Sequence, residues 1–542
     1  MNGTPNIPFP TNEPVLSYAP GARERDTLKA ALAIMSGEQI EIPVVAGGRE
    51  LRPGPTVDVV SPHARRRVLA RTHQADAAAI QAAVTAAVEA QREWASWRFE
   101  DRAAVFLKAA ELLASSHRAI VNAATMLGQS KTAFQAEIDS ACELIDFLRF
   151  NVHYAEQIYR EQPNSSPGVW NRMDHRPLEG FVYAITPFNF TAIGGNLPTA
   201  PALMGNAVVW KPAASAALSN YHFFRLLQEA GLPPGVINFV PGNAVQISDA
   251  LLADRMLAGI HFTGSTPVFH SLWKTVGGHL DRYHSYPRLV GETGGKDFVL
   301  AHASADVDAL AVALVRGAFE YQGQKCSAAS RAYVPETLWP KVRERMVGMM
   351  ETIRMGDVAD FRNFMGAVID ARAFAKIKGY LDAARTDAGV TVVAGGGADD
   401  SEGWFIEPTL LQVSDPKYRL MCEEIFGPVL TVYVYPDRRW SETLTLVDET
   451  SPYALTGAVF AQDRAALVEA DRALRNAAGN YYVNDKPTGA VVGQQPFGGA
   501  RASGTNDKAG SILNLLRWVS PRSIKETLAP PADYRYPFMG DE

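Results

Sequence analysis

The sequence predicts an α/β protein with two lobes, the first of which is built on a doubly wound parallel sheet. Residues 75–150 are rich in alanine and helical in period. From residue 180 onward, short β-branched runs begin roughly every 25 residues, the length of one strand, a crossover helix and the return. A second region of alternating helices and strands covers residues 298–483. These three observations favour two α/β lobes with a cleft between them.

The first lobe is predicted to begin with several packed helices, because apolar residues such as Ala79, Val84 and Val88 recur at helical spacing with few Gly or Pro between them. Four strands are then predicted, at Phe181–Ile185, Val208–Trp210, Val236–Val240 and Gly259–Thr263. Right-handed crossovers make such a sheet doubly wound, and its ligands bind at the carboxyl ends of the strands.

Two further segments are interpreted as candidate association arms. Tyr159–His175 is polar, contains proline and interrupts the first lobe, and Leu515–Leu528 is predicted to be a late strand. A Gly-rich turn at residues 292–295 separates the first lobe from the second.

Composition excludes several classes of protein. The chain has 542 residues, which is too long for a small scaffold held by disulfides or a metal, and no metal ligands are predicted. Its 52 Lys and Arg against 58 Asp and Glu give a net charge of -6, so nucleic acid is a poor partner. Three cysteines favour a reducing compartment, and we expect the cytosol. No signal peptide and no run of about 18 apolar residues is found, so we expect no membrane association.

Two residues are candidates for covalent chemistry. Cys326 lies in a loop beside Lys325, where a thiol can have a lowered pKa and act as a nucleophile; the alternative is a small buried apolar residue. Glu292 lies between glycines at the junction of the lobes and suits a general base, and the alternative is a solvated turn residue. Cys142 and Cys422 are interpreted as structural.

Three strand ends carry further candidates. Asn189, after the strand Phe181–Ile185, can donate to an oxyanion or simply form a turn. The segment Phe262–Thr266 ends a strand and opens a helix, which suits a pyrophosphate or is only a helix cap. Lys211 follows another strand, where a dinucleotide ribose would lie, unless it is a solvated strand end.

An acidic stripe lies on the predicted helix Ala133–Phe150. Asp139, Glu143 and Asp146 share one face of this helix. We interpret them as a solvated face, with the alternative that one carboxylate reaches a pocket and binds an ammonium group.

Five of these segments occur in the order and approximate spacing of the aldehyde dehydrogenase superfamily, which the chain resembles: Thr186–Phe190, Phe262–Thr266, Glu292–Lys296, Gly323–Ser327 and Glu423–Pro428. The stretch Thr488–Lys508 is also similar to the substrate anchor loop of the 1-pyrroline-5-carboxylate dehydrogenase branch, which oxidises L-glutamate γ-semialdehyde to glutamate in proline breakdown. The segment Glu143–Phe147 resembles the same branch. The resemblance extends from the first helices to the end of the chain.

This resemblance implies the domains, cofactor and partners. The fold would be aldehyde dehydrogenase-like, with an NAD-binding domain of residues 1–159 and 180–291 and a catalytic domain of residues 292–507 that includes the anchor loop 488–505. Residues 160–179 and 508–530 would form a β oligomerisation arm and tail. NAD is the implied cofactor, a homodimer or larger homo-oligomer the implied assembly, and a proline dehydrogenase a partner that would deliver the substrate.

The resemblance also implies roles for single residues. Cys326 would be the nucleophile, Asn189 with the Cys326 N–H would hold the oxyanion, and Glu292 would activate the water that hydrolyses the thioester. The implied cofactor contacts are Ile185, Thr186, Lys211, Ser265, Glu424 and Phe426. The implied substrate contacts are Gly489, Ala490 and Ser327 at the α-carboxylate, Glu143 at the α-ammonium, and Phe190 and Phe497 along the methylene chain.

Two departures from the family pattern stand out. No acidic residue follows Lys211 closely, so NAD over NADP rests on the resemblance alone, and Ala490 replaces a serine of some relatives. Three rival functions remain: an enzyme for a longer amino-acid semialdehyde, acyl transfer to coenzyme A, and a dinucleotide-binding protein without turnover. The anchor loop disfavours the first, Glu292 the second, and the intact catalytic residues the third.

Overall fold

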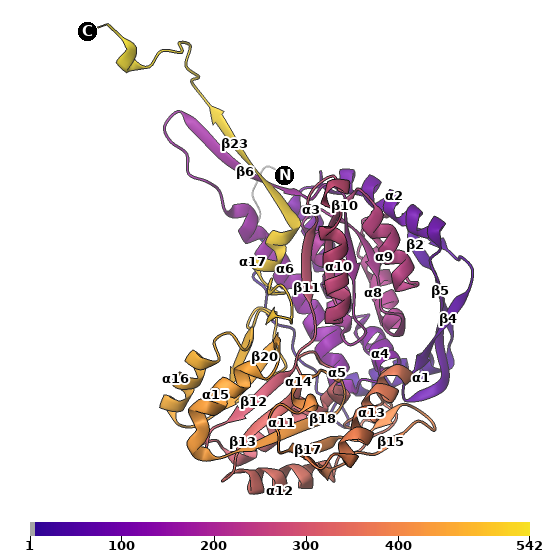
Figure 1. The fold of residues 1–542 in the computed structure, drawn as a ribbon. Coiled ribbons are helices and arrows are strands. Elements are labelled where there is room, and N and C mark those ends of the chain that lie inside the picture. Colours follow the sequence, from indigo (N-terminus) through magenta and orange to yellow (C-terminus); the bar gives the residue numbers. More distant parts are fainter. Residues whose placement is uncertain (1–5, 542) are drawn as a thin grey trace.

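Residues 6–541 are described by a computed structural model, in which two α/β lobes are stacked and a two-stranded arm projects from them (Figure 1). The predicted α/β, aldehyde dehydrogenase-like fold class is confirmed. The helices of the first lobe are α1 (Arg23–Gly37), α2 (Ala77–Trp94), α3 (Phe99–Ala114), α4 (Arg118–Gln129), α6 (Leu144–Arg160), α7 (Thr191–Leu203), α8 (Ala217–Glu229), α9 (Ala244–Ala253) and α10 (Thr266–Gly277).

The main sheet of the first lobe has the strand order β11-β10-β7-β8-β9-β2-β3. Strands β7 to β11 run parallel, with β8 and β9 on one side of β7 and β10 and β11 on the other, so the winding reverses between β7 and β10. The four predicted strands are confirmed to within two residues at each end. The strands are β2 (Val44–Ala46), β3 (Arg49–Leu51), β7 (Phe181–Ile185), β8 (Ala207–Lys211), β9 (Ile237–Phe239), β10 (Leu257–Thr263) and β11 (Arg288–Glu292).

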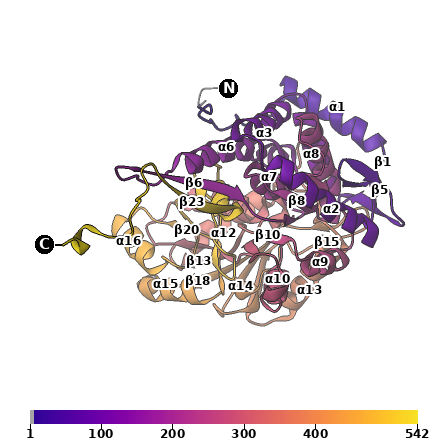
Figure 2. The same ribbon diagram turned by 90° about the horizontal axis from the view of Figure 1, so that it is seen from above.

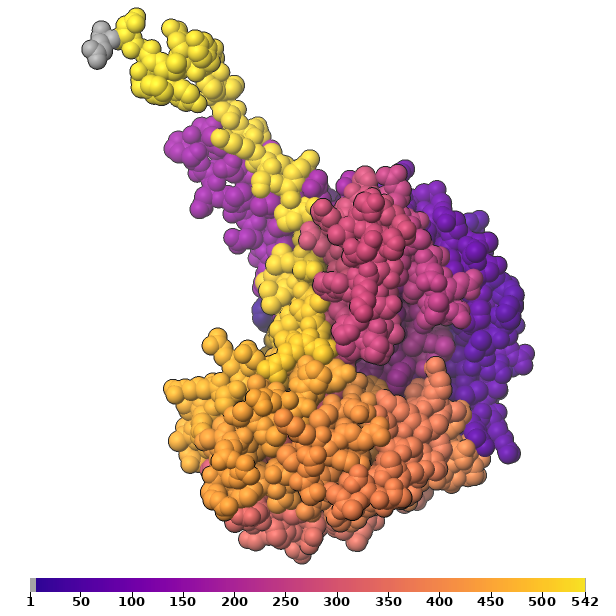
Figure 3. Space-filling model, in the orientation of Figure 1, coloured from indigo at the N-terminus to yellow at the C-terminus, as the bar shows by residue number. Residues whose placement is uncertain are grey.

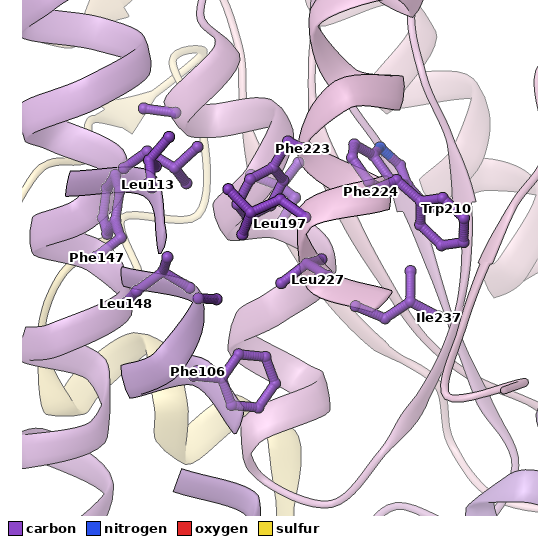
Figure 4. Close-up of a cluster of buried hydrophobic side chains, with 14 of the residues drawn as sticks. Phe106, Leu113, Phe147, Leu148, Leu197, Trp210, Phe223, Phe224, Leu227 and Ile237 are labelled. Carbon is purple, nitrogen blue, oxygen red and sulfur yellow. The ribbon is translucent and has the colours of Figure 1, made fainter. Parts of the chain in front are cut away.

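Both faces of this sheet are buried, which explains why its strands are continuous apolar runs rather than alternating ones. Val182 and Ala184 of β7 pack into the core formed with α3, α4, α6, α7 and α8, whereas Phe181 and Tyr183 face the core formed with α2, α9 and α10. Figure 4 shows the larger of these cores, where Trp210 of β8 and Phe224 of α8 lie close together.

The second lobe is built on the sheet β14-β17-β18-β13-β12-β20-β21, parallel except for β14. Its strands are β12 (Asp297–Ala301), β13 (Ala329–Pro335), β14 (Val390–Ala394), β17 (Thr409–Val413), β18 (Val429–Tyr435), β20 (Thr456–Phe460) and β21 (Asn480–Val483). Its helices are α11 (Val307–Phe319), α12 (Trp339–Met350), α13 (Ala371–Thr386), α14 (Arg419–Cys422), α15 (Trp440–Glu449) and α16 (Arg464–Ala473).

Smaller sheets complete the body. One is a three-stranded sheet at the edge of the first lobe, and two are pairs of very short strands in the second. These are β1 (Ile40–Ile42), β5 (Ala64–His73) and β4 (Thr56–Ser61), then β15 (Ala398–Asp399) with β16 (Phe405–Ile406), and β19 (Tyr453–Ala454) with β22 (Ala500–Arg501).

The arm consists of β6 (Val169–Pro177) and β23 (Val519–Thr527), which pair antiparallel along their whole length. Figures 2 and 3 show it extending away from both lobes, with the C-terminal residues beyond it. The predicted tail strand Leu515–Leu528 starts too early, because a short helix, α17 (Ile512–Leu515), precedes β23. A two-stranded ribbon is marginal by itself.

The predicted helix Ala133–Phe150 is interrupted. The chain forms a short helix α5 (Ala133–Ala136), then the π-helix η1 (Glu137–Glu143), and only then α6. A π-turn widens the helix by one residue per turn and is frequent at functional sites. It carries Glu143 at its last position.

Candidate active site

A cavity of about 450 Å³ collects most of the predicted catalytic and substrate residues. Its lining comes from η1 and α6, the loop after β7, the end of β11, the loop before β13, and residues 488–499. The predicted site residues that line it are Glu143, Phe190, Glu292, Cys326, Ser327, Gly489, Ala490 and Phe497. They lie up to 354 residues apart in the sequence, so only the tertiary fold brings them together.

Cys326 lies in the loop between α11 and β13, and its side chain is 8% exposed. The chain reaches it through a sharp left-handed turn in which Tyr321 and Gln322 have φ of 51° and 53°. Burial raises the pKa of the Cys326 thiol well above its usual value, and the Glu292 carboxylate adds to this. Our expectation that Lys325 lowers this pKa was wrong, because its ammonium group donates to Glu320 at 3.1 Å.

Glu292 ends β11 and meets the thiol directly: Cys326 Sγ donates to Glu292 Oε1 at 3.8 Å. Burial raises the pKa of Glu292 to about 8. The carboxyl is therefore not a solvated turn residue. Its ionised form is placed to remove a proton from the thiol or from a water beside it.

Asn189 lies in the loop between β7 and α7 and is 4% exposed. Its amide donates to the Gln324 carbonyl at 3.1 Å, two residues before the nucleophile candidate. Although Asn189 does not line the cavity, it is adjacent to Phe190, which does. The structure thus holds this amide against the cysteine loop.

The acidic stripe is not a solvated face, so that prediction was wrong. Asp139 and Asp146 are 1% and 3% exposed. Asp139 pairs with Lys131 at 2.7 Å and also accepts from the first backbone N–H groups of α7. Asp146 accepts from the side chain of Asn12 and the backbone of Glu13. Their burial depends on these distant partners.

Glu143 differs from its two neighbours. No hydrogen bond or ion pair within residues 6–541 holds its carboxyl, which faces the cavity. Burial raises the pKa of Glu143 well above its usual value, the charge of Asp139 adds to this, and Lys131 opposes it. A half-buried carboxyl without a partner favours a cationic ligand, because an ammonium group would compensate its charge.

The opposite wall is the loop of residues 488–499, which contains no charged residue. Gly489 has φ of +98°, a conformation that favours glycine and turns the backbone toward the cavity. Ser327 and Thr488 hydroxyls lie 2.8 Å apart, which ties this loop to the cysteine loop. Phe497 pairs with Ala509 through both backbone groups. Neutral N–H donors and hydroxyls of this kind suit a carboxylate.

The predicted cofactor residues lie outside the cavity. Ile185, Thr186, Lys211 and Ser265 lie at the carboxyl ends of neighbouring strands of the first lobe, whereas Glu424 and Phe426 lie in the loop before β18 of the second lobe. In register, Lys211 of β8 lies opposite Ile185 of β7, Ile185 opposite Phe262 of β10, and Thr263 opposite Glu292 of β11. A dinucleotide binds at this edge of a doubly wound sheet, beside the point where the winding reverses. Glu292 ends one of these strands, so the cavity and this edge adjoin.

The single cofactor candidates have distinct surroundings. Ser265 is exposed before α10, whose first N–H groups it does not cap, which suits a phosphate. Burial lowers the pKa of Lys211 to about 8, so it is not a solvated strand end. Thr186 accepts from Trp210 at 3.0 Å, and Glu424 accepts from the Gly295 N–H at 3.0 Å. Phe426, at φ of 60°, packs edge-on against Phe188.

Sequence reasoning missed several residues around the cavity. Asn12 and Glu13 come from the N-terminal segment and line the cavity. Lys131, buried behind Phe190 with its Nζ 4.1 Å from the ring centroid, was also missed. No local pattern marks these residues. The partners of Asn12 lie more than 130 residues away. Lys131 pairs with Asp139, eight residues later in the chain.

Comparison with known proteins decides the family. The family model described as the aldehyde dehydrogenase family matches residues 51–523. The chain belongs to this family. The resemblance seen in its motifs is thereby confirmed.

The relatives are more specific. Delta-1-pyrroline-5-carboxylate dehydrogenase of Dictyostelium discoideum is 53% identical over 99% of this chain and 97% of its own length. The human protein of the same name is 52% identical over 97% of this chain and 94% of its own. A solved structure of this dehydrogenase from Mycobacterium tuberculosis bound with NAD is 56% identical, with a TM-score of 0.97 over 100% of both chains.

Location is less settled by these comparisons. Both the Dictyostelium and the human relatives are named mitochondrial, so the expected cytosolic location stays a prediction. In the part of the chain that the structure describes, no helix is both long and apolar enough to cross a membrane.

Proposed function

We propose that this chain oxidises L-glutamate γ-semialdehyde, in equilibrium with 1-pyrroline-5-carboxylate, to L-glutamate, with NAD as the cofactor. The observation that carries the proposal is that one cavity contains both the Glu143 carboxyl, which has no partner among residues 6–541, and the neutral donors of residues 488–490. Between them lie the Cys326 thiol and Glu292, which supply the chemistry. The close relatives that bear this activity in their names support the same substrate.

The thiol of Cys326 attacks the aldehyde carbon, and its proton passes to the ionised Glu292, whose Oε1 lies 3.8 Å away. The aldehyde oxygen becomes an oxyanion, which the Asn189 amide and the Cys326 N–H stabilise in a buried site. NAD bound at the strand ends would supply the acceptor for the hydride of this thiohemiacetal. Cys326 then carries a thioester. Glu292 releases this first proton to solvent and then takes a proton from water, whose oxygen adds to the thioester carbon. The C–S bond breaks, the sulfur takes up the proton from Glu292, and the free thiol is restored as glutamate leaves.

Selectivity follows from the two walls. The α-ammonium group pairs with Glu143, and the α-carboxylate accepts from the Gly489 and Ala490 N–H groups and the Ser327 hydroxyl. Phe190 and Phe497 pack on the methylene groups between the α-carbon and the aldehyde carbon. An aldehyde without these charges leaves a half-buried carboxyl uncompensated, so its transition state is bound less tightly.

The proposal is tested by NADH formation at neutral pH from equilibrated 1-pyrroline-5-carboxylate, with acetaldehyde as the second substrate and NADP as the second acceptor. We expect strong turnover with the amino-acid aldehyde and NAD, and little with acetaldehyde. Comparable turnover of acetaldehyde would contradict the assignment of the two walls. Addition of coenzyme A tests the acyl-transfer rival, and we expect no rate increase.

The arm supports a proposal on assembly. β6 and β23 would pair with another copy of the chain to give a homodimer or a larger homo-oligomer, in line with their exposure beyond the body. Light scattering of the intact protein checks this, and a monomer at micromolar concentration would contradict it. A proline dehydrogenase would be the partner that supplies the substrate.

A further inference from the structure

The N-terminal segment Ile7–Tyr18, called the strap below, runs along the wall of the substrate cavity. Asn12, Glu13 and Val15 line the cavity itself. The strap is fixed at both ends: the Ile7 N–H donates to Glu156, and the Tyr18 hydroxyl donates to Glu137. A segment held this firmly beside a substrate site can position the groups it touches.

Asn12 is the residue of the strap that touches both walls of the cavity. Its side-chain Nδ2 donates to Asp146 Oδ2 at 2.8 Å on α6 and to the Val492 carbonyl at 2.7 Å on the loop. Its Oδ1 accepts from Gln494 Nε2 at 2.9 Å. One amide therefore uses both of its N–H groups and its carbonyl to join the helical wall to the loop wall.

The contacts of Asn12 lie next to the residues proposed to bind the α-ammonium and the α-carboxylate of the substrate. Asp146 follows Glu143 by three residues, which is almost one helical turn, and lies on the same side of the helix. Val492 follows Ala490 by two residues in the same loop. The distance between the ammonium-binding carboxyl and the carboxylate-binding N–H groups is thus fixed through a single side chain.

We propose that Asn12 is a positioning residue that sets the separation of these two sets of binding groups and so makes the site selective for an amino-acid aldehyde. This inference rests on the proposed function. Asn12 does not hold the strap by itself, because Glu13 pairs with Arg118 and Arg149 and its N–H donates to Asp146 at 2.7 Å. Replacement of Asn12 therefore leaves the strap in place and changes the bridge alone.

The test compares Asn12→Ala with Asn6→Ala. Asn6 directly precedes the strap, is exposed, and accepts a hydrogen bond from Arg160 at the end of α6. For Asn12→Ala we expect KM for 1-pyrroline-5-carboxylate to rise about tenfold, because the hydrogen bonds that join the two walls are lost. Turnover of a short uncharged aldehyde should stay the same, and Asn6→Ala should match the wild type on both substrates.

A second measurement separates positioning from simple destabilisation. In the Glu143→Ala background, Asn12→Ala should have little further effect on KM, because the carboxyl that it positions is gone. L-glutamate binding by calorimetry, which needs no turnover, should weaken by the same factor as KM rises. Equal losses on the charged and uncharged aldehydes, or full additivity with Glu143→Ala, would overturn the proposal.

Failure of the proposed function gives a different result. If the wild type does not oxidise 1-pyrroline-5-carboxylate but oxidises the uncharged aldehyde, the assignment of the substrate is wrong and the Asn12 inference falls with it. If the wild type is active on both but Asn12→Ala behaves as Asn6→Ala, only the positioning role is wrong.

Discussion

The two walls of the substrate cavity bind charge in different ways. The helical wall, from η1 and α6, carries the buried Asp139 and Asp146, which have partners, and the half-buried Glu143, which has none among residues 6–541. The loop wall, residues 488–499, has no charged residue and offers backbone N–H groups and hydroxyls. One wall thus holds a carboxyl without a counter-ion, and the other holds neutral hydrogen-bond donors.

The two walls contribute differently to selectivity for an amino-acid aldehyde. Backbone donors of a loop recognise any carboxylate that reaches them, whereas an uncompensated, half-buried carboxyl penalises every ligand without a cation. The helical wall therefore disfavours aldehydes that lack a cationic group, and the loop wall orients the carboxylate of the ligand. The reacting groups, Cys326 and Glu292, lie between the two walls, so changes there should affect every aldehyde equally.

The largest effect is expected between the walls. Cys326→Ala removes the nucleophile and should lower oxidation of all aldehydes by at least about 10³-fold. Binding of NAD should persist, because the cofactor candidates lie on the strand ends outside the cavity. Steady-state assays and NAD titration check both. Retained turnover would remove Cys326 from the mechanism.

Glu292→Gln should act on hydrolysis more than on hydride transfer. Loss of a general base typically costs about 10²- to 10⁴-fold, so we expect a burst of NADH followed by a slow steady state. Since the pKa of Glu292 is raised to about 8, the wild-type steady-state rate should rise with pH through this value as the base ionises, and the variant should lack this rise. A normal rate without a burst would contradict the role.

Glu143→Ala should affect only one wall. We expect kcat/KM for the amino-acid aldehyde to fall by about 10- to 100-fold, the worth of a charge-assisted hydrogen bond, with little change for an uncharged short aldehyde. Burial raises the pKa of Glu143, and an ammonium ligand favours its ionised form, so binding releases a proton and strengthens as pH rises toward that pKa. Equal losses on both aldehydes would refute the ammonium role.

Ala490→Ser is expected to give the smallest effect. The hydroxyl adds one donor to the loop wall, which should lower KM several-fold, in keeping with about 1 kcal/mol for a hydrogen bond. Aldehydes that carry a carboxylate should benefit, and those without one should not. A rise in KM would show that the loop has no room for the added group.

The walls also differ in how far the sequence predicts them. The loop wall follows from a local motif, because backbone N–H groups and the glycine at φ of +98° depend on neighbouring residues. The helical wall was predicted to be solvated, because residue spacing shows which side chains share a face and not what covers it. Asp146 is covered by Asn12, which lies 134 residues earlier in the chain.

The same reasoning applies to the fold. The parallel strands β7 to β10 are recognisable as short apolar runs, since both of their faces are buried. The π-helix η1 was not predicted, because its apolar pattern is close to that of an α-helix and its extra residue per turn is stabilised by tertiary contacts such as Glu137 with Arg118. Domain boundaries and site roles stay predictions.

The central claim is that the two walls bind the two charged groups on the α-carbon of one amino-acid aldehyde. A crystal structure of the protein with its product, L-glutamate, tests this most directly. Our account predicts the α-ammonium group at Glu143 and the α-carboxylate at the Gly489 and Ala490 N–H groups, with the side-chain carboxyl toward Cys326. An α-carboxylate bound elsewhere, or an ammonium group far from Glu143, would contradict it.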